Sequence, residues 1–223
     1  MKNLVLIIWI FFIYSCDYRN DDNFKTNINN QIQKENRYGV KSGIIKYKLT
    51  ISGNVMDNVV SGSGFENLYF DNWGTKELKE ELITKTTKAK FFKSIKEEHT
   101  KIHNLQKIEN NTVYKVDYTK KIINKSPNIN VEINSYSPNN TIKSTNILNE
   151  FGGKKIGNEI FKGYDCEIWK IRGTKQWLYK GVPLKTEHTL IGIKTIKEAI
   201  SADFNVIVIN NEFELPDYPI IEN

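Results

Sequence analysis

The sequence predicts a mainly β protein, built as an antiparallel meander with little helix. Apolar and polar residues alternate over 45–51, where Ile45, Tyr47, Leu49 and Ile51 are separated by lysine and threonine, as in a half-buried strand. Similar short segments recur about every ten residues and are joined by turns rich in Gly, Asn and Pro. No long amphipathic helix separates them, as parallel βαβ units would require.

In chain order, the first half of the domain is predicted to contain strands at 45–51, 59–65, 66–71, 76–88, 99–105 and 112–118. A turn at 56–58 joins the first two, and Gly62 and Gly64 are expected to flatten or bulge the second. Lys, Glu and Thr dominate 76–88, which indicates a strand with one solvated face. Residues 120–148 are predicted to be loops around one short strand at 130–135.

The second half is predicted to contain strands at 159–161, 164–172, 175–179, 184–193 and 202–209. Turns at 162–163, 173–174 and 181–183 separate the middle ones, because Gly and Pro favour turn geometry. The segment 195–201 is expected to form one helical turn.

Composition limits the functional classes. The 223 residues carry 32 basic and 26 acidic side chains, a net charge of +6, and the lysines are dispersed. Dispersed lysines in an exported chain predict no nucleic-acid partner. Two cysteines and three histidines give no disulfide framework and predict no metal or cofactor. On a strand, His99 and His103 would lie about 13 Å apart, too far to share one metal.

The N-terminus has the pattern of a bacterial secretory signal. Lys2 precedes an uncharged apolar run at 4–14, which as a helix would reach about 16 Å and could not span a ~30 Å hydrocarbon core. The sequence Ile-Tyr-Ser-Cys follows at 13–16. It resembles the lipobox of bacterial lipoproteins, although Tyr14 replaces the usual small residue. The resemblance implies cleavage before Cys16 and its acylation, which would attach the protein to a membrane. The alternative is a plain signal peptide or signal anchor with an incidental cysteine.

The predicted organisation is a signal peptide at 1–15, a lipidated cysteine and flexible tether at 16–36, one β-rich domain at 37–219 and a tail at 220–223. The tether is polar and without periodicity, and twenty such residues span about 25 Å.

The acidic residues after the cysteine bear on localisation. Asp17, Asp21 and Asp22 look similar to surface-export clusters of some Gram-negative lipoproteins, whereas Asp17 alone resembles an inner-membrane retention signal of enteric bacteria. The outer membrane, on its periplasmic or surface face, is predicted over the inner membrane.

The densest motif of the domain lies at 163–185. It combines Gly-Tyr-x-Cys-x-x-Trp at 163–169 with Tyr-Lys-Gly-Val-Pro-Leu-Lys at 179–185. Both segments resemble uncharacterised bacterial secreted proteins and lipoproteins, which are similar to the lipoprotein-carrier superfamily with the LolA/LolB-like fold. The resemblance covers about Lys41 to Pro219. It implies an incompletely closed antiparallel barrel, an open half-barrel, and no particular reaction.

Three aromatic residues in this motif, Trp169, Trp177 and Tyr179, are the candidate ligand-lining residues. They either pack the core or line a cavity for an apolar ligand, as open barrels with apolar mouths allow. Cys166 is interpreted as a small buried thiol rather than a nucleophile.

The leading hypothesis is a non-catalytic, membrane-anchored envelope lipoprotein that binds a lipid, an acyl chain or an envelope protein. The alternatives are a structural lipoprotein with a filled core and, less favoured, a cell-envelope hydrolase. An apolar cavity larger than roughly 300 Å³ would favour the ligand-binding hypothesis over the filled core.

Overall fold

The computed structural model describes residues 36–222 except 57, 92–93, 129–147 and 150, and these residues belong to one unit, Glu35–Asn223. Cys16, the predicted signal and most of the tether, and the predicted strand at 130–135 therefore lie outside the described residues. Nothing in the described part tests the predicted domain boundaries.

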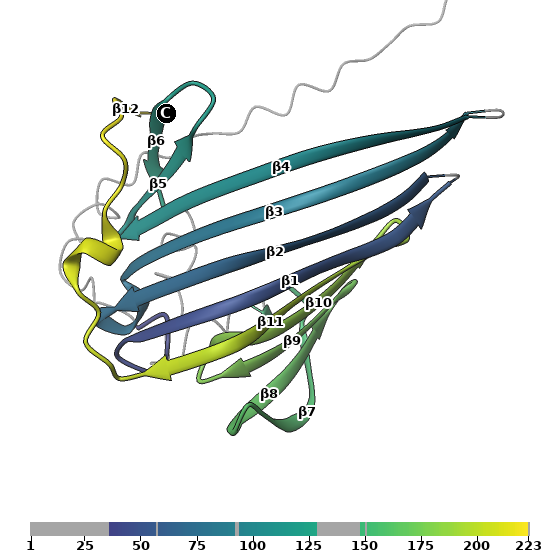
Figure 1. Cartoon of the computed structure of the whole chain (residues 1–223). Coiled ribbons are helices and arrows are strands. Elements are labelled where there is room, and N and C mark those ends of the chain that lie inside the picture. Colours follow the sequence, from purple (N-terminus) through teal and green to yellow (C-terminus); the bar gives the residue numbers. More distant parts are fainter. Residues whose placement is uncertain (1–35, 57, 92–93, 129–147, 150, 223) are drawn as a thin grey trace, which may run out of the picture. The chain divides into compact units, whose positions relative to one another are not determined.

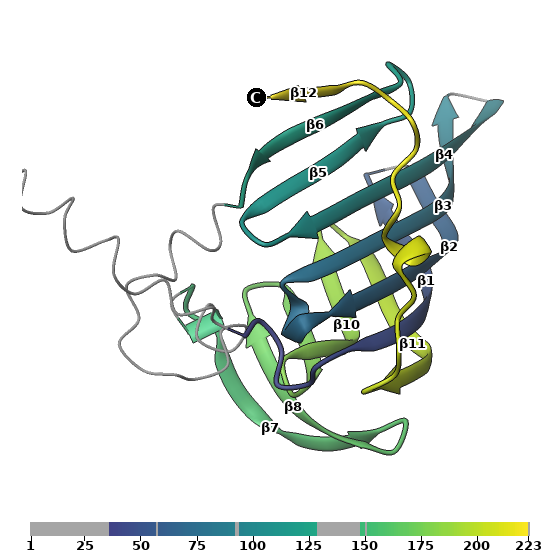
Figure 2. The same ribbon diagram turned by 90° about the vertical axis from the view of Figure 1, so that its left-hand side faces the viewer.

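Twelve strands of the described chain form one sheet in the order β12-β6-β5-β4-β3-β2-β1-β11-β10-β9-β8-β7 (Figures 1 and 2). The two edge strands do not pair with each other, so the sheet is open. All neighbours are antiparallel except β12 and β6. The prediction of a mainly β, open antiparallel sheet is confirmed. Among the described residues, no helix has the length and apolarity needed to cross a bilayer.

The first half of the sheet contains four long strands and two short ones: β1 (Gly43–Val55), β2 (Asn58–Asp71), β3 (Lys76–Phe91), β4 (Ser94–Glu109), β5 (Thr112–Asp117) and β6 (Ile122–Pro127). A 3-10 turn, η1 (Asn72–Gly74), joins β2 to β3. The strands predicted at 59–65 and 66–71 are thus one continuous strand, β2.

The second half contains β7 (Lys154–Phe161), β8 (Tyr164–Ile171), β9 (Thr174–Tyr179), β10 (Val182–Leu190) and β11 (Ile193–Phe204), followed by η2 (Asn210–Phe213) and β12 (Ile220–Glu222). The predicted helical turn at 195–201 is wrong, because these residues lie within β11 and pair with β1. The last predicted strand, 202–209, ends at Phe204 because Asn205 adopts a left-handed conformation and turns the chain out of the sheet. Most of the predicted tail forms β12.

The sheet curls on its inner face, which carries Ile45, Tyr47 and Leu49 in the main apolar core. Among the hydrogen bonds that join non-neighbouring strands, two come from tyrosine hydroxyls. The Tyr47 hydroxyl, on β1, donates to the Pro183 carbonyl of β10 at 2.8 Å, and the Tyr164 hydroxyl, on β8, donates to the Ala202 carbonyl of β11 at 2.8 Å. These contacts require the sheet to bend back toward itself between β8 and β1.

A buried ion pair lies on the same inner face. Glu66 is 2% exposed, and the Lys197 ammonium lies 2.8 Å from its carboxylate. Lys197 also sits 4.8 Å from the centre of the Tyr47 ring, a cation–π distance. Burial, with the negative charge of Glu66, raises the pKa of Tyr47 well above its ordinary value.

The outer face of the sheet is partly covered by the chain after β11. This segment, the C-terminal strap (206–215), passes across the long strands, and Figure 2 shows it in yellow. Phe213 is 2% exposed and packs with Leu78 and Leu105 in a second apolar cluster. Ile207, also on the strap, is 91% exposed. The strap therefore contributes to the core through a few side chains only.

A short N-terminal latch (residues 37–40) joins the start of the described chain to the sheet. The Arg37 and Tyr38 amides both donate to the Trp73 carbonyl, at 2.9 and 3.0 Å. The buried Tyr38 hydroxyl donates to Glu77 at 2.7 Å, and the Arg37 guanidinium lies 3.1 Å from the same carboxylate. Burial raises the pKa of Tyr38 above its ordinary value, so the phenol stays protonated and keeps this bond.

Candidate functional site

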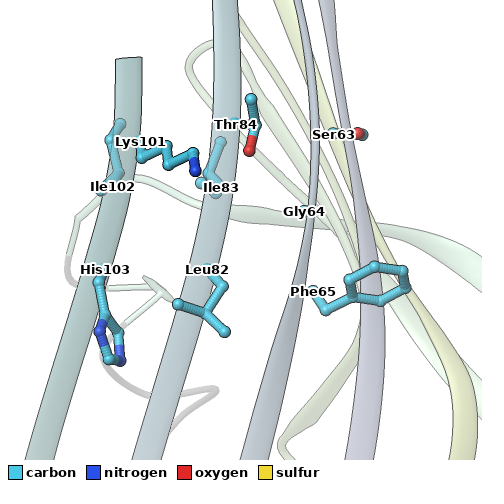
Figure 3. Close-up of a pocket in the computed structure, with 9 residues that line it drawn as sticks. All are labelled: Ser63, Gly64, Phe65, Leu82, Ile83, Thr84, Lys101, Ile102 and His103. Carbon is cyan, nitrogen blue, oxygen red and sulfur yellow. The ribbon is translucent and has the colours of Figure 1, made fainter. Parts of the chain in front are cut away.

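The outer face carries a hollow of about 380 Å³ over the middle of β2, β3 and β4 (Figure 3). We call it the β2–β4 hollow. It is lined by Ser63, Gly64, Phe65, Leu82, Ile83, Thr84, Lys101, Ile102 and His103.

Strand register explains why these side chains meet, because residues directly opposite one another in an antiparallel pair share a face. Phe65 lies opposite Leu82, and Leu82 lies opposite His103. Ser63, Thr84 and Lys101 form the next row in the same way. Tyr47 lies opposite Glu66, so Phe65, one position along, faces the other side of the sheet.

The centre of the hollow is apolar. Phe65 is 61% exposed and Leu82 is 49% exposed, although folding normally covers such side chains. Gly64 lets the two strands approach closely here, because a β-carbon at this position would lie 2.3 Å from the Leu82 carbonyl oxygen. The result is an apolar surface on two paired strands that nothing in the described chain covers.

The rim of the hollow is polar and carries positive charge. Lys101 lines it on β4, and Lys48 lies opposite Phe65 on β1. Both lysines are exposed, and neither forms an ion pair with a described residue. An apolar centre between two cationic groups suits a ligand with an apolar part and an anionic part.

His103 is held at the edge of the hollow by two contacts. Its Nε2 lies 2.9 Å from a Glu80 carboxylate oxygen, and its ring stacks on Tyr118 with the centroids 3.9 Å apart. Within the described chain, neither Ser63 nor Thr84 is hydrogen-bonded to this imidazole. A histidine and a carboxylate are therefore adjacent, but the hydroxyl contact needed for a nucleophile and its base is not formed here.

The predicted ligand-lining tryptophans lie elsewhere, in the interior. Trp169 is 6% exposed and Trp177 is 3% exposed. The indole N–H of Trp169 donates to Glu167 at 3.0 Å, and that of Trp177 donates to Glu159 at 2.9 Å. Both indoles therefore have their polar group satisfied.

Tyr179 is half-buried beside the same core. Its ring centre lies 4.7 Å from that of Tyr164 and 5.0 Å from that of Phe204. Trp177 belongs to the core cluster on which Tyr179 packs. None of the three predicted residues lines the β2–β4 hollow, and a ligand-lining role for them stays a prediction.

Cys166 is fully buried in the main core. Burial raises the pKa of its thiol to about 11, against the smaller opposing effect of a backbone hydrogen bond at Phe161. The thiol is therefore protonated near neutral pH and a poor nucleophile. Among the described residues, no group of three His, Cys, Asp or Glu side chains is placed to hold a metal ion.

Sequence reasoning did not select the residues of the hollow. The Ser-Gly-Ser-Gly stretch at 61–64 has the pattern of neither a phosphate-binding loop nor a catalytic nucleophile elbow. In the structure it lies within β2. The informative signal was Phe65, an apolar residue at a position where alternation along β2 calls for a polar one.

No protein-family model matches the chain, and no curated protein matches it. The solved structures to which it is similar in part include the following three. An uncharacterised conserved protein from Thermus thermophilus aligns with a TM-score of 0.42 and 10% identity, over 80% of this chain and 91% of its own.

A putative outer membrane lipoprotein-sorting protein domain from Vibrio parahaemolyticus aligns with a TM-score of 0.31 and 10% identity, over 79% of this chain and 91% of its own. LprF from Mycobacterium bovis aligns with a TM-score of 0.29 and 8% identity, over 81% and 91%. All three TM-scores lie below 0.5.

Proposed function

We propose that this protein is a non-catalytic, membrane-anchored lipoprotein of the bacterial cell envelope that holds a lipid or acyl chain in the β2–β4 hollow. Acylated Cys16 would attach it to the membrane, with the outer membrane favoured over the inner. The observation that carries the ligand proposal is the exposure of Phe65 and Leu82, 61% and 49%, in a hollow of about 380 Å³. That volume falls within the range of about 300–1,000 Å³ that is usual for ligand sites.

The energetics favour an apolar chain at this site. Covering exposed apolar surface contributes about 25 cal/mol per Å², so a chain lying over the Phe65 and Leu82 side chains gains free energy in proportion to the area it covers. Lys48 and Lys101 would meet a carboxylate or phosphate at the end of that chain. The second candidate function, binding of an envelope protein, would use the same apolar surface.

Native mass spectrometry of the full-length protein purified from membranes tests both parts of the proposal. A covalent anchor on Cys16 adds mass under native and denaturing conditions, whereas a ligand in the hollow adds mass only under native conditions. Leu82→Glu places a charge in the apolar centre, so we expect it to lose the native-only mass and keep the covalent one. Ile207→Glu changes an exposed apolar residue on the strap and should keep both.

The two parts of the proposal, ligand binding and lipidation, can be refuted separately. A native mass without a ligand, or a ligand retained in Leu82→Glu, would refute binding in the hollow. Acyl mass that persists in Cys16→Ser would refute lipidation of that cysteine and leave the ligand proposal standing.

A further inference from the structure

Three hairpin turns, β1–β2, β8–β9 and β10–β11, lie together at one end of the sheet, far from the N-terminal latch. The ladder pairs Gly53, near the end of β1, with Ile193, at the start of β11. The Thr189 amide of β10 donates to the Gly173 carbonyl of the β8–β9 turn at 2.9 Å. Figure 1 shows the β1–β2 and β10–β11 ends at the right, with the end of the β3–β4 hairpin beyond them.

These turns present large apolar side chains to solvent. Met56, in the β1–β2 turn, is 95% exposed. Leu190, the last residue of β10, is 60% exposed, and Ile191, in the β10–β11 turn, is 76% exposed. Ile95, the second residue of β4, is 71% exposed. The packing of the described chain gives these side chains almost nothing to contact, so folding alone does not account for their apolar character.

The backbone conformation of two of these turns disfavours the apolar residues that occupy them. Met56 has φ 53° and Ile191 has φ 48°, both in the left-handed region. Two-residue hairpin turns favour Asn, Asp or Gly at such positions, and a β-branched residue there is an outlier. Ile191 therefore disfavours the turn that it occupies, and strained positions of this kind are found at functional sites.

The charges beside the turns indicate the kind of partner. Arg172, in the β8–β9 turn, and Lys96, near the start of β4, are exposed and form no ion pair with a described residue. Glu98, an exposed carboxylate nearby, also forms no ion pair with a described residue. Among the other described charges at this end, Lys88 pairs with Glu97 at 3.3 Å and Lys194 with Glu187 at 3.2 Å. Lys170, two residues before Arg172, is exposed and forms no ion pair with a described residue. The unpaired charge among the described residues here is thus mainly positive.

We propose that this end of the sheet docks on an anionic lipid surface, with Met56, Leu190 and Ile191 inserted below the headgroups and Arg172 and Lys96 among the phosphates. A lipid interface accepts separate protruding side chains because it has no fixed shape, and apolar groups bury about 5–10 Å into it while basic residues bind anionic headgroups. This contact is separate from the β2–β4 hollow and does not depend on the proposed ligand.

Single nitroxide labels on the full-length protein in vesicles test the docking. Labels at Met56→Cys and Ile191→Cys are compared with one at Ile207→Cys, an exposed apolar position on the strap. The unsubstituted protein serves as the labelling blank for Cys16 and the buried Cys166. In vesicles with about 30% phosphatidylglycerol, we expect the labels at 56 and 191 to collide several-fold more with oxygen, relative to a polar nickel complex, than the label at 207.

Ile191→Asn separates docking from folding. Asn suits the left-handed turn, so this variant should fold at least as stably and yet reduce the oxygen preference of the label at 56. The proposal is overturned if labels at 56, 191 and 207 behave alike in anionic vesicles, or if Ile191→Asn leaves the depth at 56 unchanged. Immobilisation of the labels that depends on protein concentration and needs no vesicles would assign this end to a second copy, and would also overturn it.

Discussion

Lys197→Met should destabilise the protein more than Glu66→Met, although the two residues form one ion pair. The Glu66 side chain is 2% exposed and that of Lys197 is 21% exposed. Removing the lysine leaves a fully buried carboxylate without its cation. Removing the glutamate leaves an ammonium that retains some contact with water and with the Tyr47 ring.

The magnitudes follow from this asymmetry. Breaking a buried pair by removing one partner costs about 3–5 kcal/mol, and we expect Lys197→Met to fall in that range. Partial solvation of Lys197 lowers the expected cost of Glu66→Met to about 1–3 kcal/mol. The double variant Glu66→Met/Lys197→Met leaves no buried charge at this site, so it should be more stable than Lys197→Met alone.

Urea unfolding followed by tryptophan fluorescence measures all four free energies of unfolding, and the double-mutant cycle gives the coupling energy. Lys46→Met, which removes an exposed lysine on the other face of β1, controls for the loss of a cation in general. Additive effects of the two single changes, or a cost below about 1 kcal/mol for Lys197→Met, would refute the claim that this pair is buried and coupled.

Three further predictions concern other parts of the sheet. Because burial raises the pKa of Cys166 to about 11, a thiol reagent at pH 8 should modify it only after unfolding; prompt reaction of the native thiol would contradict its burial. Hydrogen bonds from Lys185 and then Lys194 outweigh burial and lower the pKa of Glu187, so its stabilisation is present above its unfolded pKa of ~4.3 and is lost as pH falls through the lower folded value. Glu187→Gln should therefore flatten the acid side of the urea-midpoint profile, and an unchanged profile would oppose this. Phe213→Ala should cost about 3 kcal/mol in urea unfolding by opening a cavity beneath the strap; a negligible cost would mean that the strap is not packed.

Alternation of apolar and polar residues predicted the strands that have one buried face and one solvated face. Ile45, Tyr47 and Leu49 are buried, and the intervening lysines are exposed, so 45–51 was recognised easily. The start of β4 was missed because both of its faces are solvated there, which leaves no periodic signal: the strand begins at Ser94 rather than 99.

The false helical turn at 195–201 has a similar physical origin. Apolar residues at 193, 196 and 200 fit a helical period, and nothing local excludes it. Pairing with β1 makes this segment a strand, although β1 lies about 150 residues away in sequence. Tertiary context therefore overrides the local pattern.

The hollow depends on register in the same way. Phe65 and Leu82 are opposite each other only because the turn at Asn72–Gly74 fixes how β2 pairs with β3. The sequence shows one out-of-place apolar residue, Phe65, but does not show that Leu82 lies opposite it. The predicted aromatic residues were easier to notice because bulky rings cluster near 164–179, and such clusters are also what a packed core requires.

The latch at residues 37–40 has a mechanical consequence if the chain is anchored through Cys16, as we propose. Any pull on the chain before residue 36 reaches the sheet through the bonds of the latch: the Arg37 and Tyr38 amides to Trp73, the Gly39 amide to the Lys180 carbonyl, and the contacts of Arg37 and Tyr38 with Glu77. These bonds carry the load before β1, which is secured on both sides by β2 and β11. Under tension the latch would open first and release at most about 14 Å of chain, which would absorb the displacement and leave the sheet intact.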